Sequence, residues 1–327
     1  MYEEEQKERI TRKIYSRFGE LLDSGLGTDT LIEVGKEPNI KSFRAHSFIL
    51  FAVSPYFQTA LSKPWVHKVD DKIHYKKPNI SPKIFEMILN FIYKAELNLK
   101  QQKVADICSL IKASDELSID ILNEHILECV LQDPRRLIDE DPVNILQIIF
   151  RYDYFSDFRE TFLRITCENP EKLITSIKFN NNFDKSIIVQ LIKRDDLIME
   201  EVNIWKHLLE YAIFKTKLDI NKVKKWKSED FSLLREILQD FIPHIRWFQI
   251  TGKDFWYNVK PFKKVLPKEM YDDILGYNID NSIQPKSFEI LQKRQKPLNL
   301  SRKLVVDYDE MYRRAKISRR ARSFFLE

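Results

Sequence analysis

The sequence predicts an α+β domain in its N-terminal part, followed by a part built from helices alone. Two observations lead to this fold class. Short segments among the first 76 residues alternate apolar and polar side chains, as half-buried strands do. From Asp141 to about Trp247, apolar residues recur only at helical spacing. The strands therefore belong to a first domain, and a second domain is expected to be all-α.

The first domain opens with an amphipathic helix at residues 4–23, broken by Gly25 and Gly27. Its apolar stripe consists of Ile10, Ile14, Phe18, Leu21 and Leu22. The alternating segments predict strands at residues 30–34, 39–45 and 72–76. Helices are expected to begin at Ser81-Pro82 and to span residues 104–114 and 119–131.

One stretch, Ser42–Leu61, passes from a strand into a helical hairpin without a loop between them. Residues 48–53 are apolar nearly all round, so we expect the first helix of the hairpin to be buried. Ser54-Pro55 ends that helix and begins the next, because serine is a preferred N-cap and proline fits the first helical turn.

The hairpin resembles the signature A-H-x-x-[IVL]-L-x-x-x-S-x-[YF]-F of BTB (POZ) domains. The matching residues are Ala45, His46, Ile49, Leu50, Ser54, Tyr56 and Phe57. The resemblance implies that a small mixed sheet carries a cluster of helices, within a domain of residues 1–133 that includes an N-terminal dimerisation helix. Residues 91–99 are similar to another segment of the family, with Lys94-Ala95 in place of the usual Thr-Gly.

Residues 134–248 resemble the helical BACK domain that follows BTB in many adaptors, most closely at Asp184–Ala212. Residues 249–280 resemble the helical segment that closes BACK in fungal BTB–BACK proteins. Residues 281–327 form a basic tail, with twelve Lys or Arg against five Asp or Glu, although the whole chain carries only +5. We expect this tail to be peripheral to the fold.

Residue types that support catalysis are not arranged in a known catalytic pattern. The six histidines never occur in H-E-x-x-H or beside C-x-x-C, and no Walker loop or G-x-S-x-G is present. The sequence therefore predicts a protein that is not an enzyme and has no metal or cofactor. We read His46 as a structural, capping histidine, and the acidic residues at 195–196 and 200–201 as charges at a helix N-terminus.

Three well-separated cysteines, Cys108, Cys129 and Cys167, are typical of reduced thiols in the cytoplasm or nucleus. The charged start of the chain predicts no signal peptide, and no run of residues reaches membrane-spanning length. We therefore expect a cytoplasmic and/or nuclear location and no membrane partner.

The resemblance implies a homodimer. Its interface would comprise the first helix and the hairpin, through Ile14, Phe18, Leu21, Leu22, Phe48 and Tyr56. The alternative is that the first helix packs only on its own domain.

A second expectation concerns the loop Ser62–Asp71, which in BTB adaptors carries a hydrophobic-x-Glu motif that binds cullin-3. Trp65, Val66 and His67 are the nearest match, although the glutamate is missing. A third concerns a pocket that BTB transcription factors build from an aspartate and a basic residue. Asp29 matches the aspartate, but Ser47 follows His46 where the basic residue is expected, so Asp29 needs another partner.

Together these features predict a substrate-recruiting adaptor of a cullin-3 type ubiquitin ligase, with an unknown substrate protein. The alternative is a dimeric BTB scaffold with no ligase role. A weaker reading assigns nucleic-acid binding or nuclear import to the basic residues of the tail, Arg313, Arg314, Lys316, Arg319, Arg320 and Arg322. A solvated or helical tail without such a role is about equally compatible with the sequence.

Overall fold

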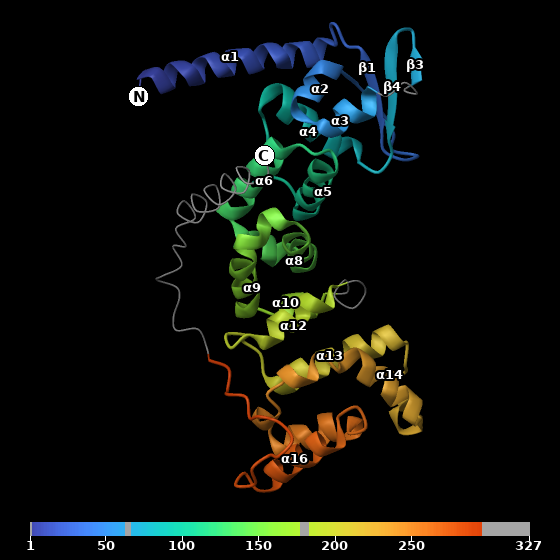
Figure 1. The fold of residues 1–327 in the computed structure, drawn as a ribbon, viewed down its shortest axis with the longest axis vertical. Coiled ribbons are helices and arrows are strands. Elements are labelled where there is room, and N and C mark those ends of the chain that lie inside the picture. Colours follow the sequence, from blue (N-terminus) through green and yellow to red (C-terminus); the bar gives the residue numbers. More distant parts are fainter. Residues whose placement is uncertain (1, 63–66, 177–182, 296–327) are drawn as a thin grey trace. The chain divides into compact units, whose positions relative to one another are not determined.

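A computed structural model of the chain describes residues 2–62, 67–176 and 183–295. The chain divides into two compact units, Met1–Asp133 and Pro134–Glu327 (Figure 1). The first unit contains a small sheet and helices, and in the described part of the second unit every regular element is helical. This is the α+β domain followed by a helical part that the sequence predicts.

Four strands form the sheet of the first unit in the order β2-β1-β4-β3. They are β1 (Thr30–Val34), β2 (Lys41–Ala45), β3 (His67–Val69) and β4 (Lys72–Lys77). β1 pairs antiparallel with β2 but parallel with β4, and β3 pairs antiparallel with β4, so the sheet is mixed. The edge strand β3 was not predicted, because three residues containing one lysine give no measurable alternation.

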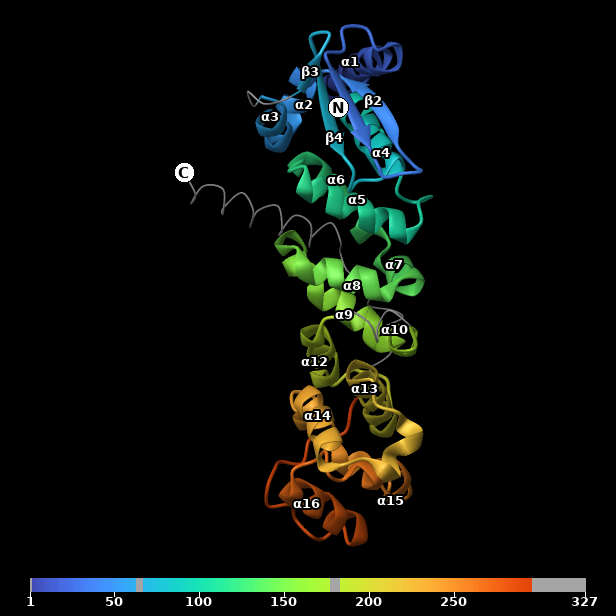
Figure 2. The same cartoon turned by 90° about the vertical axis from the view of Figure 1, so that its right-hand side faces the viewer.

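Six of the described helices, α1 to α6, belong to the first unit, and a seventh, α7, begins directly after it as the start of the second unit. They are α1 (Tyr2–Ser24), α2 (Ser47–Val53), α3 (Pro55–Leu61), α4 (Pro82–Lys94), α5 (Val104–Glu116), α6 (Asp120–Gln132) and α7 (Pro134–Glu140). Helices α2, α3 and α4 cover one face of the sheet (Figures 1 and 2). The core forms between them, where the ring of Phe43 on β2 lies 5.2 Å from that of Phe85 on α4.

The second unit continues with helices and short helical turns. They are α8 (Pro142–Arg151), η1 (Asp153–Phe158), α9 (Arg159–Glu168), α10 (Glu171–Ile174), α12 (Lys185–Lys193), α13 (Glu201–Thr216), η2 (Ile220–Lys225), α14 (Ser228–Leu238), η3 (Ile242–His244), η4 (Trp247–Gln249), α15 (Gly252–Asp254), η5 (Phe255–Val259), η6 (Lys260–Phe262) and α16 (Lys268–Ile279). Trp205 and Trp247 anchor its core, with ring centroids 5.1 Å apart. The indole of Trp205 donates to the carbonyl of Asn258, so α13 is fixed against η5.

Serine or aspartate followed by proline begins a helix at three places, as the sequence predicts. The side chain of Ser54 accepts the N–H of Phe57, and that of Ser81 accepts the N–H of Ile84. Asp141 likewise accepts the N–H of Asn144 at the start of α8. Proline occupies the first turn of each helix, where its missing N–H has no intrahelical partner to lose.

The expectation that the whole tail from Asn281 is peripheral is wrong for its described part, residues 281–295. The guanidinium of Arg294 contacts the carboxylate of Glu201 at 2.6 Å, and both side chains are less than one-tenth exposed. Arg294 also donates to the carbonyls of Ile192 and Arg194. Glu201 is therefore a buried ion-pair partner of the tail, and not only an acidic residue at a helix N-terminus.

Candidate protein-interaction site

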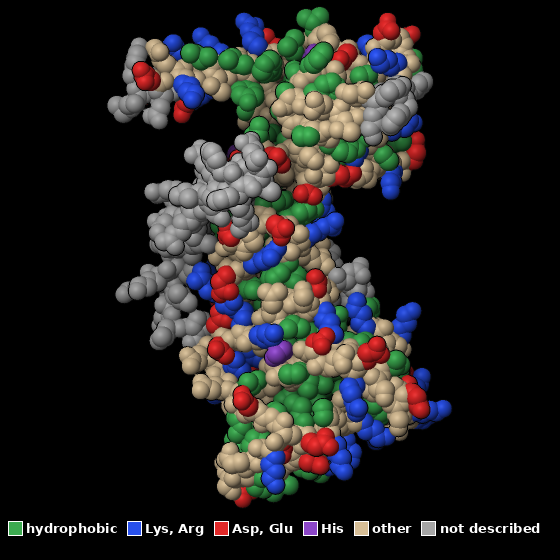
Figure 3. Space-filling view, viewed as in Figure 1, with side chains coloured by type: hydrophobic (Ala, Val, Ile, Leu, Met, Phe, Trp, Pro, Cys, Tyr) green, Lys and Arg blue, Asp and Glu red, His purple; other side chains and the backbone are tan. Residues whose placement is uncertain are grey.

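Helix α1 carries an apolar stripe that has no partner among the described residues of its own unit over most of its length. Residues 5–14 are exposed, and the N-terminal half of α1 projects away from the rest of the first unit (Figure 1). Ile14 is 48% exposed and Phe18 38%, whereas Leu21 and Leu22 are half-buried. Figure 3 shows hydrophobic side chains along α1 among charged ones.

The C-terminal end of α1 packs against α4. Gly19 is buried against the aliphatic part of Lys94, and the ammonium of Lys94 lies 2.9 Å from the carboxylate of Asp23. A Cβ added at Gly19 would approach the Lys94 side chain to 3.1 Å, so glycine permits this close contact. The last turns of α1 therefore dock on the domain, and the exposed stripe precedes them.

Helix α2 exposes a second apolar surface, which corrects the expectation that this helix is buried. Only Ser47 and Leu50 of α2 are buried, and Phe48 is 81% exposed. The ring of Phe48 contacts that of Phe51 with centroids 6.0 Å apart. An apolar composition on all sides does not distinguish a buried helix from one whose outer face is available to another chain.

Tyr56, which we placed in the dimer interface, also has partners within its own domain. Its hydroxyl lies 2.6 Å from the hydroxyl of Tyr75 and accepts a hydrogen bond from the ammonium of Lys77. Lys77 is buried and pairs with Glu116 at 2.6 Å. Burial and the neighbouring Tyr56 raise the pKa of Tyr75 to about 12.

Asp29 and Ser47 form a direct pair at the start of α2. The Asp29 carboxylate accepts the backbone N–H of Ser47 at 2.7 Å and the Ser47 hydroxyl at 2.5 Å. The serine therefore supplies the partner that Asp29 requires, and Asp29 caps the N-terminus of α2. Burial opposes ionisation of Asp29, but the hydrogen bonds from Ser47 and Thr30 outweigh it and lower the pKa of the carboxyl group.

His46 joins three segments at the same strand-to-helix junction. Its Nε2 lies 2.8 Å from the carbonyl of Leu26, and its Nδ1 lies 3.0 Å from the hydroxyl of Tyr93. Because the Leu26 carbonyl can only accept, Nε2 carries the proton and donates to it, and Nδ1 accepts from the Tyr93 hydroxyl. The Tyr93 hydroxyl in turn accepts the backbone N–H of His46. His46 is structural, as the sequence predicts, but its side chain does not cap α2. The role of Tyr93 had no signal in the sequence.

Of the three residues that we expect to bind cullin-3, only His67 lies within the described part of the chain. Trp65 and Val66 lie outside the described residues, and His67 is placed only as the first residue of β3, paired with His74. Arg313, Arg314, Lys316, Arg319, Arg320 and Arg322 of the basic tail also lie outside the described residues.

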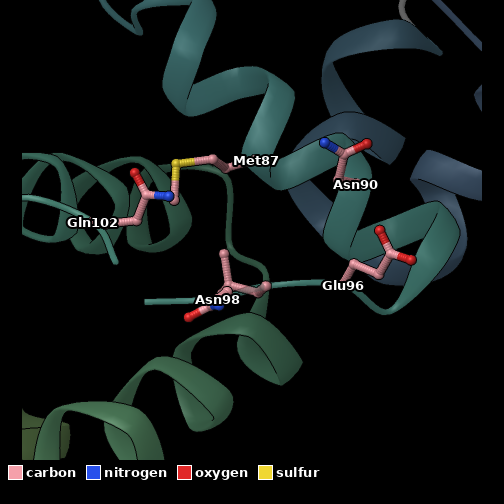
Figure 4. Close-up of a pocket in the computed structure, with 6 residues that line it drawn as sticks. Met87, Asn90, Glu96, Asn98 and Gln102 are labelled. Atoms are coloured by element: carbon pink, nitrogen blue, oxygen red, sulfur yellow. The ribbon is translucent and has the colours of Figure 1, made fainter. Parts of the chain in front are cut away.

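A pocket of about 460 Å³, lined by both apolar and amide side chains, lies beside α4. Figure 4 shows Met87 near Gln102 on one side and Asn90 above Glu96 on the other, with Asn98 between. Glu96 is the only titratable residue among those that line it. The pocket therefore offers amide groups for hydrogen bonding and no acid–base or nucleophile pair.

Within the described parts of the chain, no group of three or more His, Cys, Asp or Glu side chains could hold a metal ion. No described helix is both long and apolar enough to cross a membrane. Cys108, Cys129 and Cys167 are free thiols, and two of them, Cys108 and Cys167, are buried.

Comparison with known proteins identifies the first unit. Residues 18–132 match the family model of the BTB/POZ domain. Kelch-like protein 25 of Xenopus laevis is 23% identical over 208 residues, which cover 63% of this chain and 31% of the relative. Kelch-like protein 40a of Danio rerio is 32% identical over 88 residues, covering 27% of this chain and 13% of the relative. The chain thus spans about a third of the length of the Kelch-like 25 relatives.

Among solved structures, the BTB domain of zebrafish PATZ1 is similar, with 24% identity and a TM-score of 0.31, covering 38% of this chain and 94% of that one. The family match lies within the first unit and includes the signature around His46. The first unit of this chain therefore carries a BTB/POZ domain.

Proposed function

We propose that the protein is a protein-interaction adaptor that forms a homodimer through its BTB domain. The observation that carries this proposal is the exposed apolar surface of the α1–α2 region. The exposed side chains are Ile10, Ile14, Phe18, Leu26 and Phe48. Burying such side chains at an interface contributes about 25 cal/mol of favourable free energy for each Å² of apolar surface removed from water.

A second copy of the chain is the partner that the BTB resemblance implies for this surface. A two-fold dimer uses the same patch on both subunits, so an apolar stripe can pack on its own counterpart. Stable interfaces bury roughly 1,200–2,000 Å² in total. The projecting half of α1 supplies an extended surface that its own domain leaves exposed, which favours this arrangement over packing within one chain.

The adaptor would hold a cullin-3 type scaffold through Trp65, Val66 and His67. Support comes from the BTB/POZ match and from the similarity to Kelch-like proteins. In the sequence, Trp65 and Val66 directly precede His67, the first residue of β3. Aromatic residues dominate many binding hot spots, so Trp65 is the principal anchor in this proposal.

The second unit would serve as the BACK domain of the adaptor over residues 134–248, with residues 249–280 closing it. The Kelch-like 25 alignment supports this assignment, because 208 aligned residues cannot fit within the first unit and must continue into the second. The substrate would be another protein, and the location cytoplasmic and/or nuclear. The basic residues 313–322 would direct nuclear import or bind a polyanion.

Light scattering on the purified chain at micromolar concentration tests the dimer. We expect twice the mass of the chain for the wild type and the monomer mass after Ile14→Asp with Phe18→Asp. Ile121→Asp is the matched control, because Ile121 is an exposed apolar residue of the same unit outside the stripe. A monomeric wild type, or a control that dissociates equally, rules out this interface.

Binding to the purified N-terminal region of cullin-3 separates the adaptor from the alternative, a dimeric scaffold with no ligase role. Trp65→Ala is expected to weaken binding by about 2 kcal/mol or more if Trp65 is a hot spot. A dimer that does not bind cullin-3 at all supports the scaffold. Binding that is insensitive to Trp65→Ala contradicts only the assigned site.

A further inference from the structure

The second unit contains an open apolar groove of about 750 Å³ that its own described chain does not fill. The C-terminal half of α13 forms one wall, and η2 and the π-helical turn η5 form the others. The hydrogen bond from Trp205 to the carbonyl of Asn258, which lines the groove, fixes α13 against η5. These walls are therefore parts of one packed unit, and the groove is pre-formed.

Large apolar side chains face solvent at this groove. Phe214 at the end of α13 is 49% exposed, and Tyr257 on η5 is 68% exposed. Ile220 on η2 is also exposed, whereas Leu209 forms a buried part of the wall. Three exposed hydrophobic residues from three separate elements converge on one hollow, which is the arrangement of a binding surface and not of scattered surface residues.

Positive charge surrounds the groove. Lys206 and Lys217 line it, and the stretch of residues 206–225 holds six lysines against two acidic residues. Both acids already have partners, since Glu210 lies 3.3 Å from the His207 ring and Asp219 lies 3.0 Å from the Lys222 ammonium. Among the residues that the structure describes, Lys217, Lys224 and Lys225 form no ion pair. Figure 3 shows Lys and Arg side chains along the α13–α14 side of the unit.

We propose that this groove binds an acidic, amphipathic peptide segment of a partner protein. The proposal rests on the adaptor function and names the kind of segment that the adaptor recruits. Apolar side chains of the peptide fill the hollow between Phe214, Ile220 and Tyr257, and carboxylates on its other face meet the lysines. Helical peptides commonly bind apolar grooves in this way, through anchors at positions i, i+3, i+4 and i+7. The charge around the groove provides orientation and selects against basic segments.

The lining distinguishes this partner from a nucleic acid. Leu209, Ile213 and Leu218 contribute aliphatic wall, which neither stacks on bases nor contacts phosphates. The chain's own basic segments lack the complementary charge, and a second copy would place lysines against lysines.

Fluorescence anisotropy with the full chain tests the proposal. The probe is a fluorescein-labelled synthetic peptide of about 16 residues, or ~24 Å of helix, with Leu and Phe at the anchor positions and Glu at most others. Two control peptides replace every Glu by Lys, or every Leu and Phe by Ser. We expect the acidic amphipathic peptide to bind at least about tenfold more tightly than either control, and more weakly as salt is raised.

Substitutions in the groove locate the site. Phe214→Ala and Lys217→Glu should each weaken binding of the acidic probe by about tenfold or more. The matched controls Leu233→Ala and Lys253→Glu change an exposed leucine and an exposed lysine of the same unit outside the groove, and should change affinity by less than about twofold. Equal effects in both sets, or no preference for the acidic peptide, overturn the proposal.

Three other occupants give distinct results that would also overturn it. Single-stranded RNA that binds more tightly than the probe and is sensitive to Phe214→Ala assigns the groove to nucleic acid. A synthetic peptide of residues 306–325 that outcompetes the probe assigns it to the chain's own tail. A change of mass in light scattering on Phe214→Ala assigns it to a second copy. Cullin-3 binding is measured on the same variants, so a failed groove with intact cullin binding leaves the adaptor function standing.

Discussion

The first helix and the last described segment of the chain are held in opposite ways. α1 is a regular helix of 23 residues, yet most of it is exposed and only its final turns contact α4. Residues 281–295 contain no helix or strand, yet they are fixed to their unit by a buried ion pair between Arg294 and Glu201. Regular secondary structure and docking are therefore separate properties.

The difference shows how charge and apolarity act in each segment. In α1, charged residues pair along the helix itself, as in Arg12 with Glu8, and the apolar stripe stays available to another chain. In residues 281–295, one arginine enters the unit and satisfies a buried carboxylate together with two backbone carbonyls. A basic composition predicts a peripheral segment on average, but one fully satisfied buried pair is enough to reverse it.

Arg294→Ala should give the largest effect, because it leaves the Glu201 carboxylate buried with the backbone N–H of Arg246, at 3.0 Å, as its one hydrogen-bond donor among the described residues. Removing one partner of a buried ion pair typically costs about 3–5 kcal/mol. Urea unfolding followed by tryptophan fluorescence reports the second unit, where Trp205, Trp226, Trp247 and Trp256 lie. We expect the free energy of unfolding to fall by about 3–5 kcal/mol, which lowers the urea concentration at the unfolding midpoint.

Arg12→Ala, with urea unfolding followed by far-UV circular dichroism because Arg12 lies in the first unit, is the matched control for the exposed end. Arg12 and Glu8 are 81% and 69% exposed, and pairs of this kind contribute about 0.3–0.5 kcal/mol. A double-mutant cycle of Arg294→Ala with Glu201→Gln isolates the buried interaction. If Arg294→Ala costs no more than Arg12→Ala, the contrast between the two segments is wrong.

Local features of the fold could be predicted from the sequence, and long-range pairs could not. Ser54, Ser81 and Asp141 cap helices through contacts with residues three positions away, so their roles were readable. Glu201 and Arg294 are 93 residues apart, and nothing in either local sequence indicates the other. The pair of Asp29 and Ser47 could not be predicted for the same reason, because the two residues are 18 positions apart in the sequence.

The candidate site was predicted in part. The stripe of α1 followed from helical spacing, and the structure leaves Ile14 and Phe18 exposed. The burial of α2 was predicted wrongly, since composition alone does not show on which side of a helix its own domain ends. The groove beside α13 had no sequence signal, because Phe214, Ile220 and Tyr257 converge only in the fold.

Ser47→Ala should give the next largest effect, at the point where the end of α1 joins the domain. The substitution removes the hydroxyl that donates to Asp29 and keeps the backbone N–H bond that caps α2. Hydrogen bonds to charged groups contribute about 1.5–3 kcal/mol. We expect faster amide hydrogen exchange in α2 and in residues 25–29, measured by mass spectrometry, with no change in the second unit. Uniform exchange in both units would contradict this local role.

The same pair predicts an acid dependence. The pKa of Asp29 is lower in the folded chain than the ~3.9 of a free aspartate, so near pH 4 the unfolded chain binds more protons. The stabilisation from Asp29 is fully present above about pH 4 and is lost as the pH falls through the folded pKa. Burial also opposes ionisation of Glu116, but the hydrogen bonds from Lys77 and Asn79 outweigh it and lower the pKa of that carboxyl group. The stabilisation from Glu116 is therefore also lost as the pH falls.

The difference between wild type and Ser47→Ala isolates Asp29 from Glu116. Urea midpoints from far-UV circular dichroism at about pH 5 and about pH 3 provide the measurement. The gap between the two proteins should be larger at the higher pH and should narrow in acid, because protonation of Asp29 removes the charge that the Ser47 hydroxyl stabilises. A gap that is the same at both values would show that the Ser47 hydroxyl does not stabilise the Asp29 carboxylate.

Ala95→Gly should give the smallest effect, and it should be stabilising. Ala95 ends α4 in the left-handed region at φ 53° and ψ 30°, directly after the Lys94 that holds α1. An L-residue in this conformation costs about 1–2 kcal/mol, which glycine avoids while losing more freedom on folding. The net gain is expected to be about 0.5–1 kcal/mol in urea unfolding. Ala105→Gly, in the first turn of α5, is the matched control and should lose stability by up to about 1 kcal/mol. If both substitutions destabilise equally, the left-handed conformation of Ala95 costs no more than the added freedom of glycine in the unfolded chain.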